Sequence, residues 1–216
     1  MCLNNWGGID HKVLEFHEYV NLFSGKSGSG KSTVMDAIQV ILYGSFSPSF
    51  LNKAADDAKN RRSVLSYLRG EQKDGSANRK DCDFCSVIAL EIEDTGTHII
   101  TCIGIAFEVR KSDSEIKKFV YFSHSGKMPE SEYLTEQGVC YSNQEIKKLV
   151  SARTKSDDNR GKGEVNRIYG SKEAYLGTLY DVILGYIDQN RFITMEKSAI
   201  ALKMTNGTGQ FIRDYM

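Results

Sequence analysis

Hydrophobic periodicity changes along the chain, and each period predicts a different kind of element. Short apolar runs over residues 2–16 predict a two-stranded ribbon with its turn at 7–8. The apolar run 19–24 predicts a third strand directly after it. Over 34–42, apolar residues recur at helical spacing, so we expect a largely buried helix that ends at Gly44.

A two-residue period in the middle of the chain predicts further strands. Residues 87–94 alternate between two faces, which is typical of a half-exposed strand. Gly96 turns the chain into a second apolar stretch at 98–109, and 118–122 forms a third. Because short turns join them, we expect an antiparallel meander over about 85–124.

Outside these strands the pattern predicts helices and polar loops. The charge-rich stretch 45–80 is typical of a protein surface. The expected elements are helices at 54–60, at 64–68, at 143–152 and from residue 190 onward, a polar loop at 155–163, and a longer helix marked by Tyr175, Leu176, Leu179, Ile183 and Ile187. The C-terminal part, about 171–216, is therefore mainly helical.

Composition narrows the class of protein. The chain has 216 residues and 24.2 kDa, with 28 basic and 28 acidic side chains, which is typical of one neutral globular domain. Its longest apolar stretch, 99–107, is too short to cross a bilayer, so we expect no membrane partner. The acidic residues among the first twenty argue against a secretory signal. We therefore expect a cytoplasmic or equally reducing location.

The cysteines support the same location. Five cysteines without even spacing fit reduced thiols better than a disulfide framework. Only Cys82 and Cys85 form a C-x-x-C pair, and a zinc site needs further ligands. The other candidates are scattered singly: Cys102, Cys140, His98 and His124. We favour two thiols at the start of a strand over a metal or redox site.

One motif carries recognisable chemistry. The phosphate-binding pattern G-x-x-x-x-G-K-[ST] is matched in every specified position at 25–32, between the expected strand and the expected helix. The candidate nucleotide-binding residues are Gly25, Lys26, Ser27, Gly28, Ser29, Gly30, Lys31, Ser32 and Thr33. This context is the one in which the motif binds a triphosphate.

Each residue type in the motif has a physical role. Gly25 and Gly30 allow backbone angles that point successive N–H groups at an anion, and the helix N-terminus adds its positive dipole end. Lys31 is placed to reach the β and γ phosphates of ATP, and the Ser32 hydroxyl to ligate Mg²⁺. Thr33 offers one more donor. Lys26 is equally compatible with a phosphate contact and with a solvated side chain.

The rest of a catalytic site is not evident. Hydrolysis needs an acidic residue after a second apolar strand to hold the metal. Of two candidates, 87–94 alternates in polarity, and 182–188 continues a helical phase. A Ser-Gly-Gly signature is absent, since Ser125-Gly126 is followed by Lys127. We therefore expect a chain that holds a nucleotide but carries no complete set of catalytic residues.

These features resemble the N-terminal half of the ATPase head of SMC and SbcC-like proteins. The matching segments are LNNWGG at 3–8, VNLFSG at 20–25, KSTVMDAI at 31–38, FLNKAA at 50–55, YLRGE at 67–71 and FIRDY at 211–215. They are most similar to the condensin-like subgroup that contains MukB-like and Wadjet (JetC-type) proteins. The resemblance covers almost the whole chain, and the phosphate loop is its least specific part.

The resemblance implies a fold, a partner set and an activity. It implies an α/β P-loop NTPase fold, the N-terminal lobe of an ABC-type head over 1–216, with a mixed sheet, an antiparallel meander and flanking helices. ATP hydrolysis would require a C-terminal lobe and a second head, in a dimer associated with DNA. A coiled coil would follow, so the resemblance implies a truncated gene product, a split subunit or a fragment.

Several family roles stay open. The family's glutamine near the γ phosphate has two candidates, Gln189 and Gln210. The arginine that approaches nucleotide or DNA is ambiguous among Arg61, Arg62 and Arg69, each of which we expect to be a solvated surface charge. Residues 147–172 carry eight basic and three acidic side chains, which fits either a contact to DNA phosphates or, as we favour, a solvated loop.

Two other functions fit the motif. A self-contained P-loop kinase would use the arginines of 61–69 as a lid over the phosphates. An ATP-responsive binding module would use the loop without catalysis. Turnover by the chain alone would favour the kinase, and turnover only with a complementary half would favour the SMC-like head.

Overall fold

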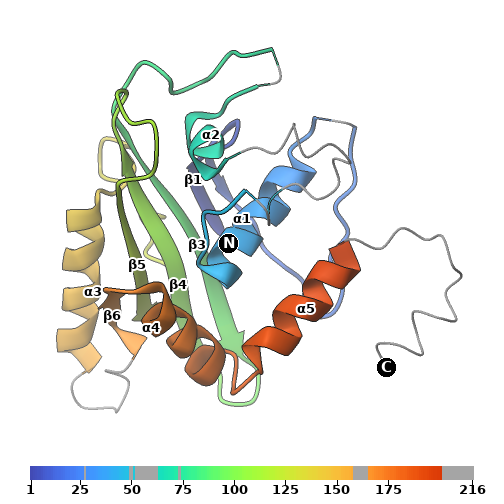
Figure 1. The fold of residues 1–216 in the computed structure, drawn as a ribbon. Coiled ribbons are helices and arrows are strands. Elements are labelled where there is room, and N and C mark those ends of the chain that lie inside the picture. Colours follow the sequence, from blue (N-terminus) through green and yellow to red (C-terminus); the bar gives the residue numbers. More distant parts are fainter. Residues whose placement is uncertain (27, 49–50, 52–62, 73, 158–164, 201–216) are drawn as a thin grey trace, which may run out of the picture.

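A single antiparallel sheet organises the protein (Figure 1). The computed structural model describes residues 1–26, 28–48, 51, 63–72, 74–157 and 165–200, and of positions 156–157 and 197–200 only the backbone. The strands are β1 (Cys2–Trp6), β2 (Ile9–Val13), β3 (Phe84–Asp94), β4 (Ile99–Val109), β5 (Lys118–Ser125) and β6 (Arg167–Tyr169). Their order is β2-β1-β3-β4-β5-β6, and every neighbouring pair is antiparallel.

The ribbon and the meander expected from the hydrophobic periods are confirmed. The expectation of a mixed sheet is wrong for the described residues, because all of the paired strands are antiparallel. The predicted strand at 19–24 is also wrong: this segment has no regular secondary structure and pairs with no strand of the described structure. Phe23 packs against the core of the sheet, but Tyr19, Val20 and Leu22 are exposed.

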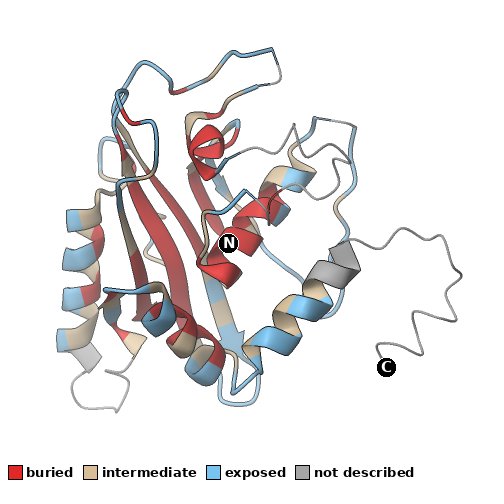
Figure 2. Ribbon diagram, viewed as in Figure 1, coloured by how far each residue is buried: buried red, intermediate tan, exposed pale blue. Residues whose placement is uncertain are grey.

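Helices cover both faces of the sheet. One face carries α1 (Lys31–Tyr43) and α2 (Val64–Arg69), which packs against β1. The same face also carries α4 (Lys172–Gly177), the π-helical turn η3 (Thr178–Ile183) and α5 (Gln189–Ile200). The other face is covered by α3 (Asn143–Asp157) (Figure 1). We call these the P-loop face and the α3 face. Each face has its own hydrophobic core, so the central strands are buried on both sides (Figure 2).

The central strands explain why one sequence-based expectation failed. Ile88 and Ile105 face the core of the P-loop face, whereas Val87 and Ala106 face the core of the α3 face. The half-exposed strand expected at 87–94 is therefore buried on both sides at its start and exposed only toward its end. Small and large apolar side chains alternate between the two faces at the start of this strand, and in the sequence this alternation looks like the polar and apolar alternation of a half-exposed strand.

The stretch 45–80 also differs from its predicted surface character. All residues of α2 except Arg69 are buried, and the N-cap Ser63 accepts a hydrogen bond from the Ser66 N–H. Tyr67 stacks on Trp6 with ring centroids 5.1 Å apart. The helix expected at 54–60 lies outside the described residues. Polar composition was misleading because hydrogen bonds satisfy the polar groups that α2 buries.

The C-terminal helices are confirmed in place but not in continuity. The long helix expected over 175–187 is broken: α4 passes into η3, which ends at Ile183. α3 begins at Asn143 as expected and continues past the predicted end, to Asp157. The helix from residue 190 onward is present as α5 up to the last described residue. No helix among the described residues is long and apolar enough to cross a membrane.

Candidate functional site

The glycine-rich loop adopts a conformation that its glycines make possible. Gly25, Gly28 and Gly30 have φ angles of 154°, 84° and 88°, in the left-handed region that other residues rarely adopt. A Cβ on Gly25 would lie 2.7 Å from the Ser29 hydroxyl oxygen. The glycines therefore allow a tight loop in which the backbone of Gly25 approaches the Ser29 side chain closely.

Lys31 lies across this loop. Its ammonium donates hydrogen bonds to the carbonyl oxygens of Gly25 and Lys26, at 2.6 and 2.8 Å, and to the Ser29 hydroxyl at 3.2 Å. These acceptors are exposed, so the ammonium can exchange them for the oxygens of an anion at little cost. The lysine is thus held at the loop in advance of binding.

The N-terminus of α1 is open toward the same loop. Its N-cap is Gly30, which has no side chain to occupy the first N–H groups, and the first turn contains no acidic residue. These N–H groups have no partner within the helix and carry the positive end of its dipole. Ser32 is exposed beside them. Ser27 lies outside the described residues, and Lys26 is exposed, which leaves both of its interpretations standing.

Aromatic side chains hold α1 in position at both ends. At its start, the Trp6 indole donates a hydrogen bond to the Thr33 carbonyl at 2.9 Å. At its end, the hydroxyls of Tyr175, Tyr180 and Tyr121 donate to the carbonyls of Ile41, Leu42 and Gly44, at 2.9, 3.0 and 2.6 Å. These bonds satisfy carbonyls that a helix C-terminus leaves without a partner. The helix that carries Lys31 is therefore fixed to the sheet.

An open pocket adjoins the loop. Its volume is about 540 Å³, within the range of about 300–1,000 Å³ common for ligand sites. One wall is β2, with Asp10 and Lys12 at the rim. The lining residues are Gly8, Ile9, Asp10, His11, Lys12, Leu14, Phe23, Ser24, Ser29, Gly30, Lys31 and Val34. Apolar walls beside a cationic loop suit a ligand with a flat apolar part and an anionic part.

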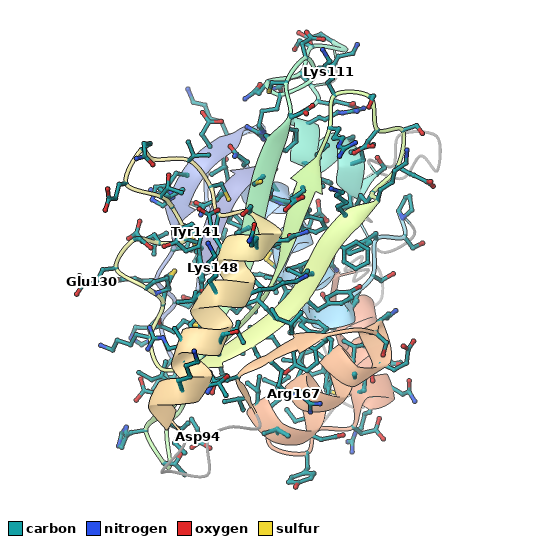
Figure 3. The ribbon with its side chains drawn as sticks, turned by 90° about the vertical axis from the view of Figure 1, so that its left-hand side faces the viewer. Asp94, Lys111, Glu130, Tyr141, Lys148 and Arg167 are labelled. Carbon is teal, nitrogen blue, oxygen red and sulfur yellow. The ribbon has the colours of Figure 1, made fainter. Side chains whose placement is uncertain are left out.

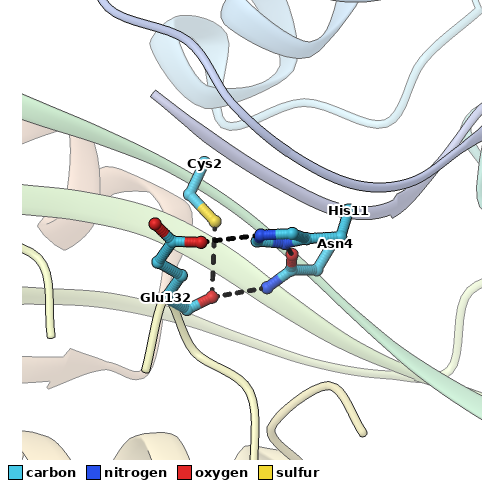
Figure 4. A network of polar contacts seen from close by, with 4 residues as sticks. All are labelled: Cys2, Asn4, His11 and Glu132. Carbon is cyan, nitrogen blue, oxygen red and sulfur yellow. Dashed lines mark hydrogen bonds and ion pairs between the residues drawn. The ribbon is translucent and has the colours of Figure 1, made fainter. Parts of the chain in front are cut away.

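A polar network supports this wall from the opposite side of the sheet (Figure 4). The two ring nitrogens of His11 lie 2.6 Å from the Asn4 side-chain oxygen and 2.6 Å from the Glu132 carboxylate. Asn4 and Cys2 both donate to the Glu132 carbonyl, at 2.8 and 3.4 Å. The loop after β5 is thus tied to β1 and β2, so β2 is held in place although it is an edge strand.

The structure describes two of the candidates for the other family roles, Arg69 and Gln189. Arg69 is half-buried and donates to the carbonyls of Lys111 and Asp113, so its expected role as a solvated charge is wrong. Arg61, Arg62 and Gln210 lie outside the described residues, and Gln189 begins α5. Within the described part of the chain, no three histidine, cysteine or acidic side chains form a metal site.

The sequence did not reveal the residues that contact α1 and the turn between β1 and β2. Tyr67 donates a short hydrogen bond to Asp36, a buried carboxylate in the second turn of α1. Arg79 is buried, and its guanidinium donates a hydrogen bond to the Gly7 carbonyl in the turn between β1 and β2. Tyr67 lies in the YLRGE segment of the resemblance, but the resemblance implies no role for its side chain, and Arg79 belongs to no matching segment. The available signal is Asp36 in a helix that the sequence predicts to be largely buried, since a buried carboxylate needs a partner.

Loop, lysine and helix N-terminus together define a P-loop of the nucleotide-binding type. In agreement with this geometry, residues 1–58 match the family model described as the P-loop containing region of AAA domain. The match covers the ribbon, the loop and α1, and it supports a P-loop ATPase, which in general binds a nucleotide together with a divalent metal. No curated protein matches the chain.

Proposed function

We propose that the chain is the ATP-binding half of an SMC-like, DNA-associated ATPase head, which hydrolyses ATP only with a complementary lobe and a second head. The observation that carries this proposal is the segment that enters the P-loop. Tyr19, Val20 and Leu22 are 80%, 78% and 90% exposed. A lone P-loop domain would bury such residues, because the strand before the loop is normally a central one.

The backbone of the exposed segment is not used by the sheet. The segment has no regular secondary structure, and no strand of the described structure pairs with it. Contiguous exposed apolar residues of this kind mark interaction sites, and an unpaired edge accepts a further strand. Because the segment leads directly into Gly25, a strand added here would also fix the entrance to the P-loop. The complementary lobe is the proposed source of that strand.

ATP with Mg²⁺ fits the residues that are present. The N–H groups of the loop, the α1 N-terminus and the Lys31 ammonium would hold the phosphates, and the exposed Ser32 hydroxyl would ligate the metal. The pocket beside β2 would receive the nucleoside. When bound, Mg²⁺ would neutralise charge on the phosphates. Asp10, the acid in the pocket wall, is engaged by Arg79, which argues for a metal-binding acid from the complementary lobe.

A turnover experiment tests this proposal. ATP hydrolysis is measured for the chain alone, for the chain mixed with a separately expressed candidate C-terminal lobe, and for the same mixture with Lys31→Ala. We expect binding without turnover by the chain alone, turnover in the mixture, and loss of that turnover with Lys31→Ala. Turnover at an ordinary enzymatic rate by the chain alone would contradict the half-site proposal and favour a self-contained enzyme.

Association with DNA is the further part of this proposal, supported by the charge of the α3 face. The exposed cations there are Lys127, Lys147, Lys148 and Lys155. Figure 3 looks onto this face and labels Lys148. Among the described residues none of the four forms an ion pair. Such cations can release counterions from DNA, so binding to duplex DNA should weaken steeply with salt.

The matched variants for DNA binding are Lys147→Gln with Lys148→Gln on α3, and Lys111→Gln with Lys117→Gln in the turn between β4 and β5. We expect only the α3 pair to weaken binding to duplex DNA and to reduce its salt dependence. Equal effects of both pairs would indicate nonspecific attraction and would remove this part of the proposal.

A further inference from the structure

Arg79 is a buried cation outside the P-loop motif, and every nitrogen of its guanidinium is used. The side chain is 7% exposed. Nε donates to the Leu68 carbonyl at 2.9 Å, Nη1 donates to the Asp10 carboxylate at 2.7 Å, and Nη2 donates to the Gly7 carbonyl. Burying a guanidinium is costly unless it is paired and fully hydrogen-bonded. These contacts therefore hold Arg79 in one position.

Through its hydrogen bond to the Gly7 carbonyl, Arg79 is linked to the start of α1. Gly7 lies at the ribbon turn and packs so closely on α1 that an added Cβ would lie 2.5 Å from a Thr33 methyl carbon. The Gly7 N–H donates to the Tyr67 carbonyl at 2.8 Å. Gly70 leaves the Gly7 carbonyl accessible, because a Cβ there would lie 2.6 Å from that oxygen. Arg79 thus fixes the turn against which α1 begins.

Through its hydrogen bond to Asp10, Arg79 is also linked to the pocket wall. Asp10 lines the pocket beside the P-loop, and its side chain is 81% exposed although it is bonded to Arg79. A carboxylate in this wall would repel the triphosphate of a bound nucleotide. The guanidinium compensates that charge. Burial lowers the pKa of Arg79, and the Asp10 carboxylate opposes this shift.

We infer that Arg79 is a positioning residue of the nucleotide site, which places the Gly7 turn against the P-loop helix and neutralises Asp10 in the pocket wall. This inference rests on the proposed binding of ATP at the P-loop. It assigns Arg79 no contact with the nucleotide. It predicts that loss of the guanidinium weakens binding in two separable ways, through geometry and through the uncompensated carboxylate.

The test compares ATP binding by Arg79→Met, Asp10→Asn and the double variant, with thermal unfolding measured in parallel. We expect Arg79→Met to weaken ATP binding by about tenfold, because it leaves a carboxylate without its counter-charge beside the phosphates. Adding Asp10→Asn should recover a large part of that loss. A merely structural role predicts no recovery, because the second substitution restores no contact, and this outcome would overturn the inference.

Two further variants keep the test decisive. If Arg79→Met does not fold, Arg79→Lys keeps the charge but loses the fork of donors, and we expect it to weaken ATP binding by about threefold to tenfold. Wild-type affinity in Arg79→Lys would overturn the inference. Asp10→Asn alone leaves the buried Arg79 guanidinium without its counter-charge, so we expect it to lower the temperature of thermal unfolding and to weaken ATP binding less than Arg79→Met does. A loss of ATP affinity as large as that of Arg79→Met would show that Asp10 acts on the ligand itself and would overturn the inference.

Measurements on the wild type and on Lys31→Ala distinguish failure of this inference from failure of the proposed function on which it rests. If the wild type binds no ATP, the proposed function fails. If the wild type binds ATP, Lys31→Ala does not, and Arg79→Met or Arg79→Lys binds as the wild type does, then only the role of Arg79 is wrong.

Discussion

The two faces of the sheet differ in how far certain titratable side chains are exposed. On the α3 face, burial raises the pKa of Cys102 to about 12 and lowers the pKa of His124 to about 4, so both groups are neutral near pH 7. On the P-loop face, the exposed Asp10 carboxylate and the half-exposed Lys31 line an open pocket. Cys102 and His124 therefore serve as packing on the α3 face, whereas Lys31 and Asp10 stay accessible to a ligand on the P-loop face.

Apolar side chains show the same contrast. On the α3 face, Phe122 and Tyr133 are fully covered by α3 and by the loop after β5. On the approach to the P-loop, Tyr19 and Leu22 remain exposed. Within the described residues, the core of the α3 face is therefore covered, whereas the approach to the P-loop keeps exposed apolar surface that the proposed partner would cover. Substitutions on the two faces should accordingly separate stability from binding.

The largest expected effect is a loss of stability from a substitution on the α3 face. Phe122→Ala removes a fully buried ring from the core of the α3 face, and such truncations cost about 3–5 kcal/mol of unfolding free energy. We expect urea unfolding to show this loss, while the affinity of the folded protein for ATP is unchanged. A parallel loss of ATP affinity would show that the two faces are coupled.

The next effect is a pH dependence that arises on the same face. His124 is buried and its Nε2 lies 2.9 Å from the Tyr133 hydroxyl. Because its pKa is about 4 when folded and about 6.5 when unfolded, the unfolded chain binds more protons between these values. Stability should therefore fall as the pH decreases from about 6.5 to 4, by up to about 3 kcal/mol.

Unfolding measured across this pH range checks the prediction. His124→Gln should remove most of the slope between pH 6.5 and 4. His98→Gln is the matched control, because His98 is exposed in the turn between β3 and β4. An equal slope in His124→Gln and the wild type would assign the pH dependence to other groups.

The sequence predicted those parts of the molecule that depend on local chemistry. The ribbon, the meander, α1 and the P-loop follow from short-range patterns, and the structure contains all four. The strand at 19–24 failed for a different reason. Its apolar composition is correct for a strand, but a strand also needs a neighbour, and no sequence pattern within the run reports whether one is present.

Long-range contacts explain the other differences. Arg79 lies in a polar run, and its burial depends on carbonyl groups at Gly7 and Leu68 that only the folded ribbon and α2 bring together. The break between α4 and η3 likewise coincides with tyrosines that reach α1. A one-dimensional pattern contains the residue types but not these partners. The residues of the P-loop motif were therefore easier to predict than the residues of other elements that pack around it.

A third prediction concerns the accessible face. Lys31→Ala removes an exposed ammonium that contacts the loop, and the loss of such charged hydrogen bonds to phosphate should weaken ATP binding about a hundredfold. Thermal unfolding should change little. The control is Lys26→Ala, because Lys26 contacts Lys31 through its carbonyl. Calorimetric titration with ATP measures both, and equal losses would mean that both side chains reach the phosphates.

The smallest expected effect on the isolated chain is the most informative about the proposed partner. Leu22 is 90% exposed, so Leu22→Ser removes almost no buried surface and should change the unfolding free energy by less than about 0.5 kcal/mol. If a complementary strand covers 19–24, the same substitution should weaken association with the candidate C-terminal lobe. Val139→Ser, at an exposed apolar residue in the loop after β5, is the control. Sedimentation of the two halves together measures this, and unchanged association with Leu22→Ser would place the partner elsewhere, because a strand paired here must bury Leu22 or its neighbours.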